Sequence, residues 1–414
     1  MNNFFKSTEY SVLLFFVDLF YHLMDIIYRG VIMIINDNVK YVGVDDLELD
    51  LFEGQFKIPL GIAYNSYVIM DEKIAIMDSV DIRFANQWIK NIKAAIGERT
   101  PSYLIVQHME PDHSSSIMKF LESFGNVTIV ASAKAFVMMR SFFGNDFTNM
   151  GIIVGDGDSI SLGKRELLFI SAPMVHWPEV IMTYDQNDKI LFSADAFGKF
   201  GALCYEDEWI HEARRYYFGI VGKYGSQVQA LLKKLKNLDI KVICSLHGTV
   251  LSQKPDYYFN LYDIWSSYRA EENGVLIAYT SVYGNTKKAA EILRNLLVQK
   301  GVKVSLFDLA RCDIYQAVAD AFRYNRLVLA TTTYNAGIFP HMKEFIEHLI
   351  NRNYGNRQVG FIENGSWSPI ATVIMKDKLK NGKNLKFAKT DVRILSALNE
   401  ESLKQIRALS EELS

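Results

Sequence analysis

The pattern of apolar residues changes near residue 273, and this change divides the chain into two parts that must fold differently. From about residue 33 to 260, short apolar runs alternate with tight-turn signals at 71–73, 156–158 and 185–188, and helical segments intervene. This pattern predicts a mixed α/β domain with hairpins, not a regular strand–helix series. We expect residues 261–273 to form a helical connector between the two parts.

In residues 274–414, apolar strands alternate with helical segments. The segment 287–299, for example, places its apolar residues on one face of a helix. Such alternation predicts a doubly wound parallel sheet with helices on both faces. The expected strands are 275–279, 302–306, 327–330, 359–362 and 392–395.

The composition is ordinary for a soluble globular protein, with 49% hydrophobic residues, 22% charged residues and a formal net charge of −2. This charge, without a stripe rich in lysine and arginine, argues against a nucleic-acid-binding protein. The cysteines at 204, 244 and 312 form no Cys-x-x-Cys pair, so no disulfide framework is expected. This cysteine usage indicates a reducing compartment, and we expect the cytoplasm.

Residues 1–32 form an apolar extension whose status the sequence leaves open. Asp18, His22, Asp25 and Arg29 interrupt the apolar stretch at steps that put them on one stripe of a helix. Each charge would cost about 2.5–3.5 kcal/mol at the centre of a membrane, so a transmembrane helix is not expected. No small-residue cleavage site follows, which weakens a secretory signal. A start at Met33 and a docked or partner-binding helix are the two remaining interpretations.

Four side chains of metal-ligand type fall within six positions, directly after an apolar strand at 103–106. They are His108, Glu110, Asp112 and His113. Two imidazoles and two carboxylates so close together are costly unless a cation holds them. Nitrogen and oxygen donors without a thiolate favour iron, manganese or zinc. The alternative is a polar loop that binds no metal.

Three more potential ligands follow three more strands. His176 comes shortly after the strand at 167–171, while Asp195 and His247 directly follow apolar runs ending at 194 and 246. Together with the first cluster they make a set of four histidines and three carboxylates. That set is too large for one tetrahedral ion, and it suits two metal ions about 3.5–4 Å apart that share a carboxylate.

The first part of the chain resembles the metallo-β-lactamase-type domains, which implies an αββα fold. Hydrolases of that type usually show His-x-His-x-Asp-His, and Glu110 replaces the second histidine here, which favours iron over zinc. His-x-Glu-x-Asp-His with a later His, Asp and His is the signature of the flavodiiron proteins, also called A-type flavoproteins. The resemblance covers about residues 33–414. It implies one iron on His108, Glu110 and His176, a second on Asp112, His113 and His247, and Asp195 as the bridge, with no catalytic residues beyond these ligands.

The second part of the chain carries three loops suited to FMN, and it resembles flavodoxin. Hydroxyl and backbone N–H groups at 280–286 precede a helix and suit a single phosphate. No Gly-x-Gly-x-x-Gly is present, which disfavours a dinucleotide. Tyr334 and Trp367 could flank a flat ring; helix-capping hydroxyls in ordinary turns are the alternative. The expected FMN contacts are Thr280, Ser281, Val282, Tyr283, Gly284, Asn285, Thr286, Thr331, Thr332, Thr333, Tyr334, Asn335, Ala336, Gly337, Asn364, Gly365, Ser366 and Trp367.

The resemblance implies an oxidoreductase that reduces dioxygen to water, nitric oxide to nitrous oxide, or both. It implies two irons and FMN per subunit, rubredoxin or another external electron donor, and a head-to-tail homodimer or dimer of dimers. Two other functions remain open: a zinc-dependent metallohydrolase fused to a flavodoxin domain, and an electron carrier or redox sensor with a vestigial metal site. The sequence does not choose between O2 and NO.

Overall fold

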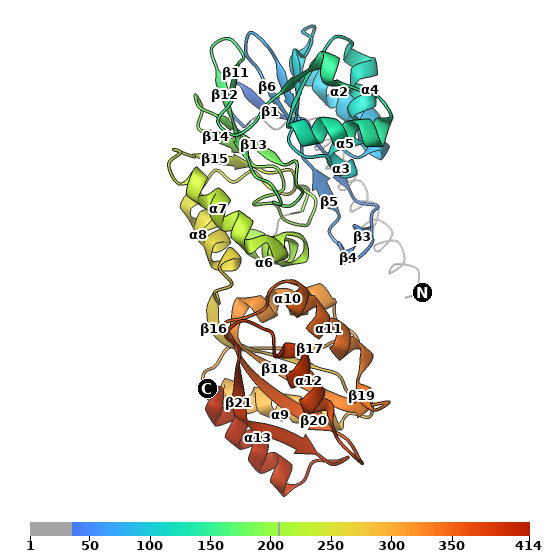
Figure 1. The fold of residues 1–414 in the computed structure, drawn as a ribbon, viewed down its shortest axis with the longest axis vertical. Coiled ribbons are helices and arrows are strands. Elements are labelled where there is room, and N and C mark those ends of the chain that lie inside the picture. Colours follow the sequence, from blue (N-terminus) through green and yellow to red (C-terminus); the bar gives the residue numbers. More distant parts are fainter. Residues whose placement is uncertain (1–34, 206–207) are drawn as a thin grey trace, which may run out of the picture.

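The computed structural model describes residues 35–205 and 208–414, arranged as two lobes along the long axis of the molecule (Figure 1). The extension expected at 1–32 lies outside the described residues. The first lobe ends with helix α8 (Pro255–Ser266), and the second begins with strand β16 (Glu272–Tyr279). The expected connector at 261–273 therefore overlaps the end of α8, and we propose that the boundary between the two domains lies in residues 267–271, which join α8 to β16. No helix in the described part of the chain is long and apolar enough to cross a membrane.

The first lobe contains two sheets packed face to face. The larger has the order β1 (Val39–Tyr41), β6 (Tyr67–Ile69), β7 (Ala75–Met77), β8 (Tyr103–Val106), β9 (Thr128–Ala131) and β10 (Gly151–Ile153). The smaller has the order β11 (Ser159–Ser161), β12 (Glu166–Ser171), β13 (Ile181–Asp185), β14 (Ile190–Phe192) and β15 (Val242–Cys244). Their facing side chains form one buried core, to which Tyr67 and Ile105 contribute from the larger sheet and Phe169 and Phe192 from the smaller.

Helices cover the outer faces of both sheets (Figure 1). On the larger sheet, Trp88 and Phe120 fill the core beneath α2 and α4. On the smaller sheet, Val228 and Trp265 do the same beneath α7 and α8. This is the expected αββα fold, which is confirmed. The covering helices are α2 (Ala85–Ile96), α4 (Ile117–Phe124) and α5 (Ala133–Phe143) on one side, and α6 (Trp209–Tyr216), α7 (Gly225–Leu235) and α8 on the other.

The second lobe is a parallel sheet with the strand order β17-β16-β18-β20-β21. The first two strands along the chain exchange places, which is the flavodoxin-like order and is the expected fold. The other four strands are β17 (Val304–Asp308), β18 (Tyr324–Tyr334), β20 (Gln358–Asn364) and β21 (Lys386–Ile394). Helices α9 (Asn285–Gln299) and α13 (Glu400–Glu412) cover one face, and α10 (Ile314–Arg323), α11 (Pro340–Asn351) and α12 (Ala371–Leu379) cover the other.

Four strands of this sheet are longer than the sequence indicated, since β16 begins at Glu272 and β20 ends at Asn364. Strand β21 begins at Lys386, six residues before the expected 392, because this edge strand buries only some of its residues and the polar residues 389–391 interrupt its apolar pattern. Strand β18 continues from 330 to Tyr334 and pairs with β19 (Gly337–Ile338). Residues 331–334, expected in a loop, therefore lie in a strand that extends beyond the apolar core.

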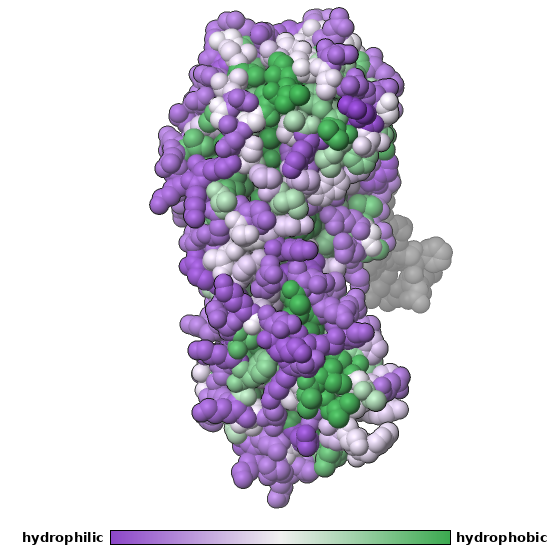
Figure 2. Space-filling view, viewed as in Figure 1, coloured by the Kyte–Doolittle hydropathy of each residue, from purple (hydrophilic) through white to green (hydrophobic). Residues whose placement is uncertain are grey.

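The lobes share buried contacts at their junction. Phe218 stacks on Phe322 with ring centroids 4.1 Å apart, and Arg215 pairs with Asp313 at 3.2 Å. Arg357, just before β20, donates to the connector carbonyl of Tyr268 at 2.8 Å. The amino ends of the parallel strands therefore face the first lobe, and their carboxyl ends point away from it (Figure 1). Hydrophilic residues cover most of the face shown in Figure 2, with smaller apolar groups on each lobe.

Candidate metal centre and flavin loops

The first ligand cluster sits where β8 ends and a short helix begins. Glu110 precedes α3 (Pro111–Ser114), and Pro111 occupies its first turn, where its fixed φ is suited to a helix. This helix presents Asp112 and His113, while His108 and Glu110 lie in the loop before it. At the neighbouring sheet, β14 and β15 run parallel, so Asp195 and His247 emerge from adjacent strand ends.

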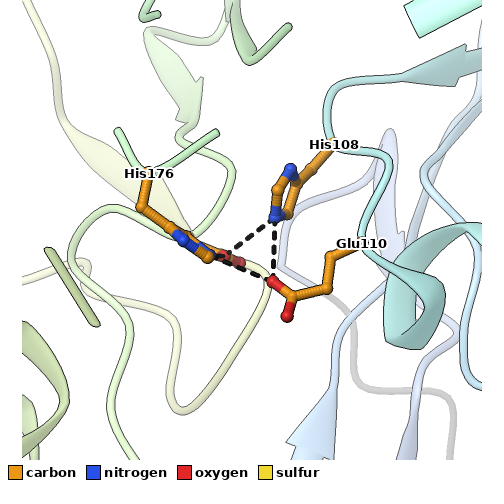
Figure 3. A group of neighbouring side chains, drawn as sticks. His108, Glu110 and His176 are labelled. Carbon is orange, nitrogen blue, oxygen red and sulfur yellow. Dashed lines mark hydrogen bonds and ion pairs between the residues drawn. The ribbon is translucent and has the colours of Figure 1, made fainter. Parts of the chain in front are cut away.

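The potential ligands form two groups, within each of which the ligand atoms lie within 4.8 Å of one another. The first group is His108, Glu110, His176 and Asp195, and the second is Asp112, His113 and His247. Figure 3 shows how Glu110 and the two histidines of the first group meet, although they come from different loops. All of the metal ligands expected from the sequence are thus brought together in the structure.

In each group the imidazole Nε2 atoms face the carboxylates. Glu110 Oε2 lies 3.2 Å from His108 Nε2 and 3.0 Å from His176 Nε2. Asp112 Oδ2 lies 3.3 Å from His113 Nε2 and 3.4 Å from His247 Nε2. The arrangement gives each group two nitrogen donors and one carboxylate of its own.

Asp195 reaches both groups. Its Oδ2 is 3.3 Å from His108 Nε2 and 2.9 Å from His176 Nε2. Its Oδ1 is 3.5 Å from His113 Nε2 and 3.8 Å from His247 Nε2. One carboxylate with an oxygen toward each group is the geometry that a bridging ligand requires.

The centre contains buried polar atoms that fit a bound metal. Both carboxylate oxygens of Asp112, both of Asp195, and Nε2 of His176 are buried without a hydrogen-bond partner. Such atoms cost free energy unless a cation or donor satisfies them. The described side chains supply only nitrogen and oxygen donors here, which suits a pair of non-haem iron ions.

The histidines of the centre differ in their electrostatics. Burial lowers the pKa of His108, but the carboxylates of Asp195 and Glu110 outweigh burial and hold that pKa well above its usual value. Burial also lowers the pKa of His247, but Asp112 and Asp195 outweigh it and raise that pKa. At His113 burial prevails, and the pKa falls to about 4. His113 is therefore less compensated by negative charge than His108 and His247.

The loops expected to bind FMN meet at the carboxyl edge of the second sheet. Thr280 follows β16 and its hydroxyl lies 2.6 Å from that of Thr331 on β18. Gly284, with φ of 92°, turns the chain into α9, and its N–H donates to Ser281 Oγ at 3.1 Å. The hydroxyls of Thr286 and Thr332 are buried without a partner, which fits a phosphate and a polar ligand at this edge.

The remaining FMN residues lie around this edge in different environments. Asn335 and Ala336 form the tight turn between β18 and β19, and both have positive φ. The side chains of Tyr283 and Trp367 are 94% and 82% exposed. The expected contacts are thus gathered at one sheet edge, and their individual roles stay predictions.

Comparison with known proteins agrees with this geometry. The model of the ODP family of beta lactamases matches residues 62–248, and the flavodoxin model matches residues 277–373. An uncharacterized protein of Methanocaldococcus jannaschii is 31% identical over 354 residues, covering 84% of this chain and 89% of its own length. The anaerobic nitric oxide reductase flavorubredoxin of Aliivibrio fischeri is 29% identical over 347 residues, which cover 81% of this chain and 70% of that protein.

Solved structures of whole chains are similar too. The flavodiiron protein of Giardia intestinalis is 26% identical, with a TM-score of 0.83, covering 92% of this chain and 96% of that one. The rubredoxin oxygen:oxidoreductase of Desulfovibrio gigas shares the fold, with a TM-score of 0.85 at 23% identity. The match covers 92% of this chain and 98% of that one. The chain belongs to the flavodiiron protein family.

Two residues of this flavodiiron protein lie against the metal centre and escaped the sequence analysis. Glu179 accepts a hydrogen bond from His108 Nδ1 at 2.8 Å. Tyr216 is fully buried, its hydroxyl has no partner, and its ring lies 5.5 Å from the ring of His247. Burial, then the charges of Asp195, Glu110 and Asp112, raise the pKa of Tyr216 well above its usual value.

The sequence contains a clue to the role of Glu179. Glu179 follows His176 by three residues, and a carboxylate close to a metal-binding histidine commonly supports a second histidine. Tyr216 lies in an aromatic stretch of α6, and nothing local to that stretch points to the metal centre.

Proposed function

We propose that this flavodiiron protein is an oxidoreductase that reduces dioxygen to water, nitric oxide to nitrous oxide, or both, at a pair of iron ions. FMN relays the electrons from rubredoxin or another external donor. The observation that carries the proposal is the pair of ligand groups joined by Asp195, with buried carboxylate oxygens that lack other partners. Two of the similar proteins, a nitric oxide reductase and a rubredoxin oxygen:oxidoreductase, support the same reaction class.

The proposed ligand assignment follows the two groups. His108, Glu110 and His176 hold one iron, and Asp112, His113 and His247 hold the other. Asp195 bridges them, in agreement with its distances to both pairs of imidazoles. When bound, the iron pair supplies electrons and open positions for a diatomic gas, while FMN delivers electrons singly or in pairs.

The protein's own side chains supply shape and protons around this pair. The rings of Phe52 and Tyr64 lie 5.3 and 6.1 Å from the ring of His247, so aromatic surface limits water on that side. Both reactions consume protons together with electrons. We propose the Tyr216 hydroxyl as a hydrogen-bond donor to a gas molecule there, because it is buried, its ring lies beside that of His247, and it has no other partner.

Replacing Tyr216 with phenylalanine should slow gas reduction by about 100-fold, the usual scale for losing one positioned hydrogen-bond donor at a reacting centre. Iron and FMN content should not change, because the hydroxyl makes no structural hydrogen bond. Oxygen- and NO-electrode rates of the loaded variant measure the effect.

Tyr217→Phe is the matched control. The Tyr217 hydroxyl is also buried without a partner, but its ring packs on Tyr262 and Trp265, away from the metal groups. Equal rates for the two variants and the unmodified protein would show that Tyr216 has no part in the reaction.

We propose that the active unit is a head-to-tail homodimer, alone or as part of a dimer of dimers. The FMN loops follow the carboxyl ends of strands that point away from the first lobe (Figure 1). Since β18 alone has 11 residues at about 3.3 Å each, the FMN of one chain lies far from that chain's own metal centre. The exposed Tyr283 and Trp367 offer an aromatic surface at the FMN edge that the metal lobe of a second copy would cover.

We propose that the protein acts in the cytoplasm, since Cys204, Cys244 and Cys312 form no disulfide bond with one another in the structure. The enzymatic proposal is tested by parallel anaerobic assays of the purified, iron- and FMN-loaded protein with reduced rubredoxin. Consumption of O2, of NO or of both is expected, and the ratio of the two rates assigns the preferred gas. If neither gas is consumed, the proposed function is wrong.

A further inference from the structure

We propose that Glu179 makes the two metal positions unequal. By positioning His108 and strengthening it as a donor, Glu179 stabilises the ferric state of the iron held by His108, Glu110 and His176. This inference rests on the proposed di-iron function and adds which of the two irons accepts the first electron.

Glu179 connects the two loops that carry the ligands of the first group. Its side chain is fully buried, and Oε1 accepts hydrogen bonds from His108 Nδ1 at 2.8 Å and from the Met109 N–H at 2.9 Å. It lies three residues after His176, and Ser132 Oγ donates to its carbonyl at 2.7 Å. One carboxylate therefore fixes the loop of His108 relative to the loop of His176.

This contact also fixes the tautomer of His108. Because Nδ1 donates to a carboxylate, the lone pair of the neutral ring is on Nε2, which faces Glu110 and Asp195 at 3.2 and 3.3 Å. The ring is thus held with its metal-binding nitrogen toward the centre before a metal arrives.

Neither histidine of the second group donates its Nδ1–H to a carboxylate in the described part of the chain. His247 Nδ1 donates to the backbone carbonyl of Ala63 at 2.7 Å, and His113 Nδ1 is buried without a partner. The ligands themselves are otherwise matched: each group has two histidines, one carboxylate of its own, and a share of Asp195. The asymmetry therefore lies in the groups that support the ligands.

A carboxylate behind an imidazole N–H makes the ring a more basic ligand than a neutral carbonyl does. A more basic ligand favours the more highly charged ferric ion and lowers the reduction potential of its iron. With iron bound, the position at Asp112, His113 and His247 would have the higher reduction potential and would take the first electron that dithionite supplies. The position supported by Glu179 would take the second.

Glu179→Gln tests this directly, because glutamine has the same length and retains an oxygen that can accept from His108 and Met109, but it removes the charge. We expect the more negative of the two iron potentials to move upward, so that the two steps approach each other in an EPR-monitored dithionite titration. We also expect the affinity for iron, measured by chelator competition, to fall by about 10- to 100-fold.

Glu53→Gln is the control for altering a nearby carboxyl group that supports no ligand. Glu53 interacts electrostatically with Glu110 and Asp112 from the turn between β3 (Leu51–Phe52) and β4 (Phe56–Lys57), but no hydrogen bond joins it to a ligand. We expect this variant to keep the separation of the two potentials. The inference would be overturned if Glu179→Gln bound both irons and kept the same separation between the two reduction potentials. It would also be overturned if Glu53→Gln narrowed that separation by as much as Glu179→Gln does.

A measurement on the unmodified protein keeps the inference testable if Glu179→Gln does not fold. Mössbauer spectra of the 57Fe-loaded protein, reduced by one electron, should show one ferric and one ferrous ion with the valences localised. A valence-averaged pair would overturn the inference. Failure of the unmodified protein to bind two irons would instead count against the proposed function itself.

Discussion

Replacing Asp195 with alanine should abolish the reduction of both gases and lower the iron content to one ion per chain or less. Asp195 is the described side chain whose two oxygens lie toward the two different imidazole pairs. Its loss removes the bridge and leaves each group with three ligands. Because loss of a supporting residue alone costs about 10- to 100-fold, we expect a loss of activity beyond about 100-fold here. Elemental analysis and gas-electrode rates measure the two effects.

Asp239→Ala is the matched control for this change. Asp239 lies in the same lobe, is exposed, and pairs with Lys241 at the surface. We expect its replacement to leave iron content and rates unchanged. An Asp195→Ala protein that still holds two irons and still turns over would contradict the bridging role and would favour an electron carrier with a vestigial metal site.

The second large effect is expected from mixing two inactive variants. Asp195→Ala disables the metal centre, and Ser281→Asp places a negative charge in the loop expected to hold the FMN phosphate. Each variant alone should be inactive. In a head-to-tail heterodimer, the intact FMN of the first chain faces the intact metal centre of the second, so one of the two sites works.

Random pairing makes half of the dimers mixed, so the mixture should recover about a quarter of the normal rate. Two different affinity tags allow the mixed dimers to be isolated, and these should reach about half of the normal rate. Purified mixed dimers that stay inactive would mean that electrons pass within one chain, and the proposed arrangement would be wrong.

Most of the metal centre could be predicted from the sequence because its ligands follow buried strands. An apolar run locates each strand, and neighbouring strand ends meet at one edge of a sheet, so His108, His176, Asp195 and His247 could be expected to converge. The overall fold could be predicted for the same reason: hairpin signals dominate before residue 260 and strand–helix alternation after 274.

The contacts of the supporting residues could not be predicted, because long-range packing brings Tyr216 to the centre and places the Glu179 carboxylate on His108 and not on the nearby His176. Glu179 lies 71 positions from His108 in the sequence, and Tyr216 reaches His247 from a helix on the outer side of the smaller sheet. The ends of β16, β18, β20 and β21 also differ from the expected ones. These strands extend beyond the continuous apolar runs that the sequence shows, and pairing with neighbouring strands holds the added residues.

Diffraction at the iron absorption edge tests the central claim most directly. Crystals of the protein purified under anaerobic conditions should give two anomalous peaks per chain. One peak should lie among His108, Glu110 and His176, and the other among Asp112, His113 and His247, with Asp195 between them. The signal should disappear below the iron edge. Two peaks that persist below the iron edge and rise at the zinc edge would contradict the account and would favour a zinc hydrolase fused to a flavodoxin domain.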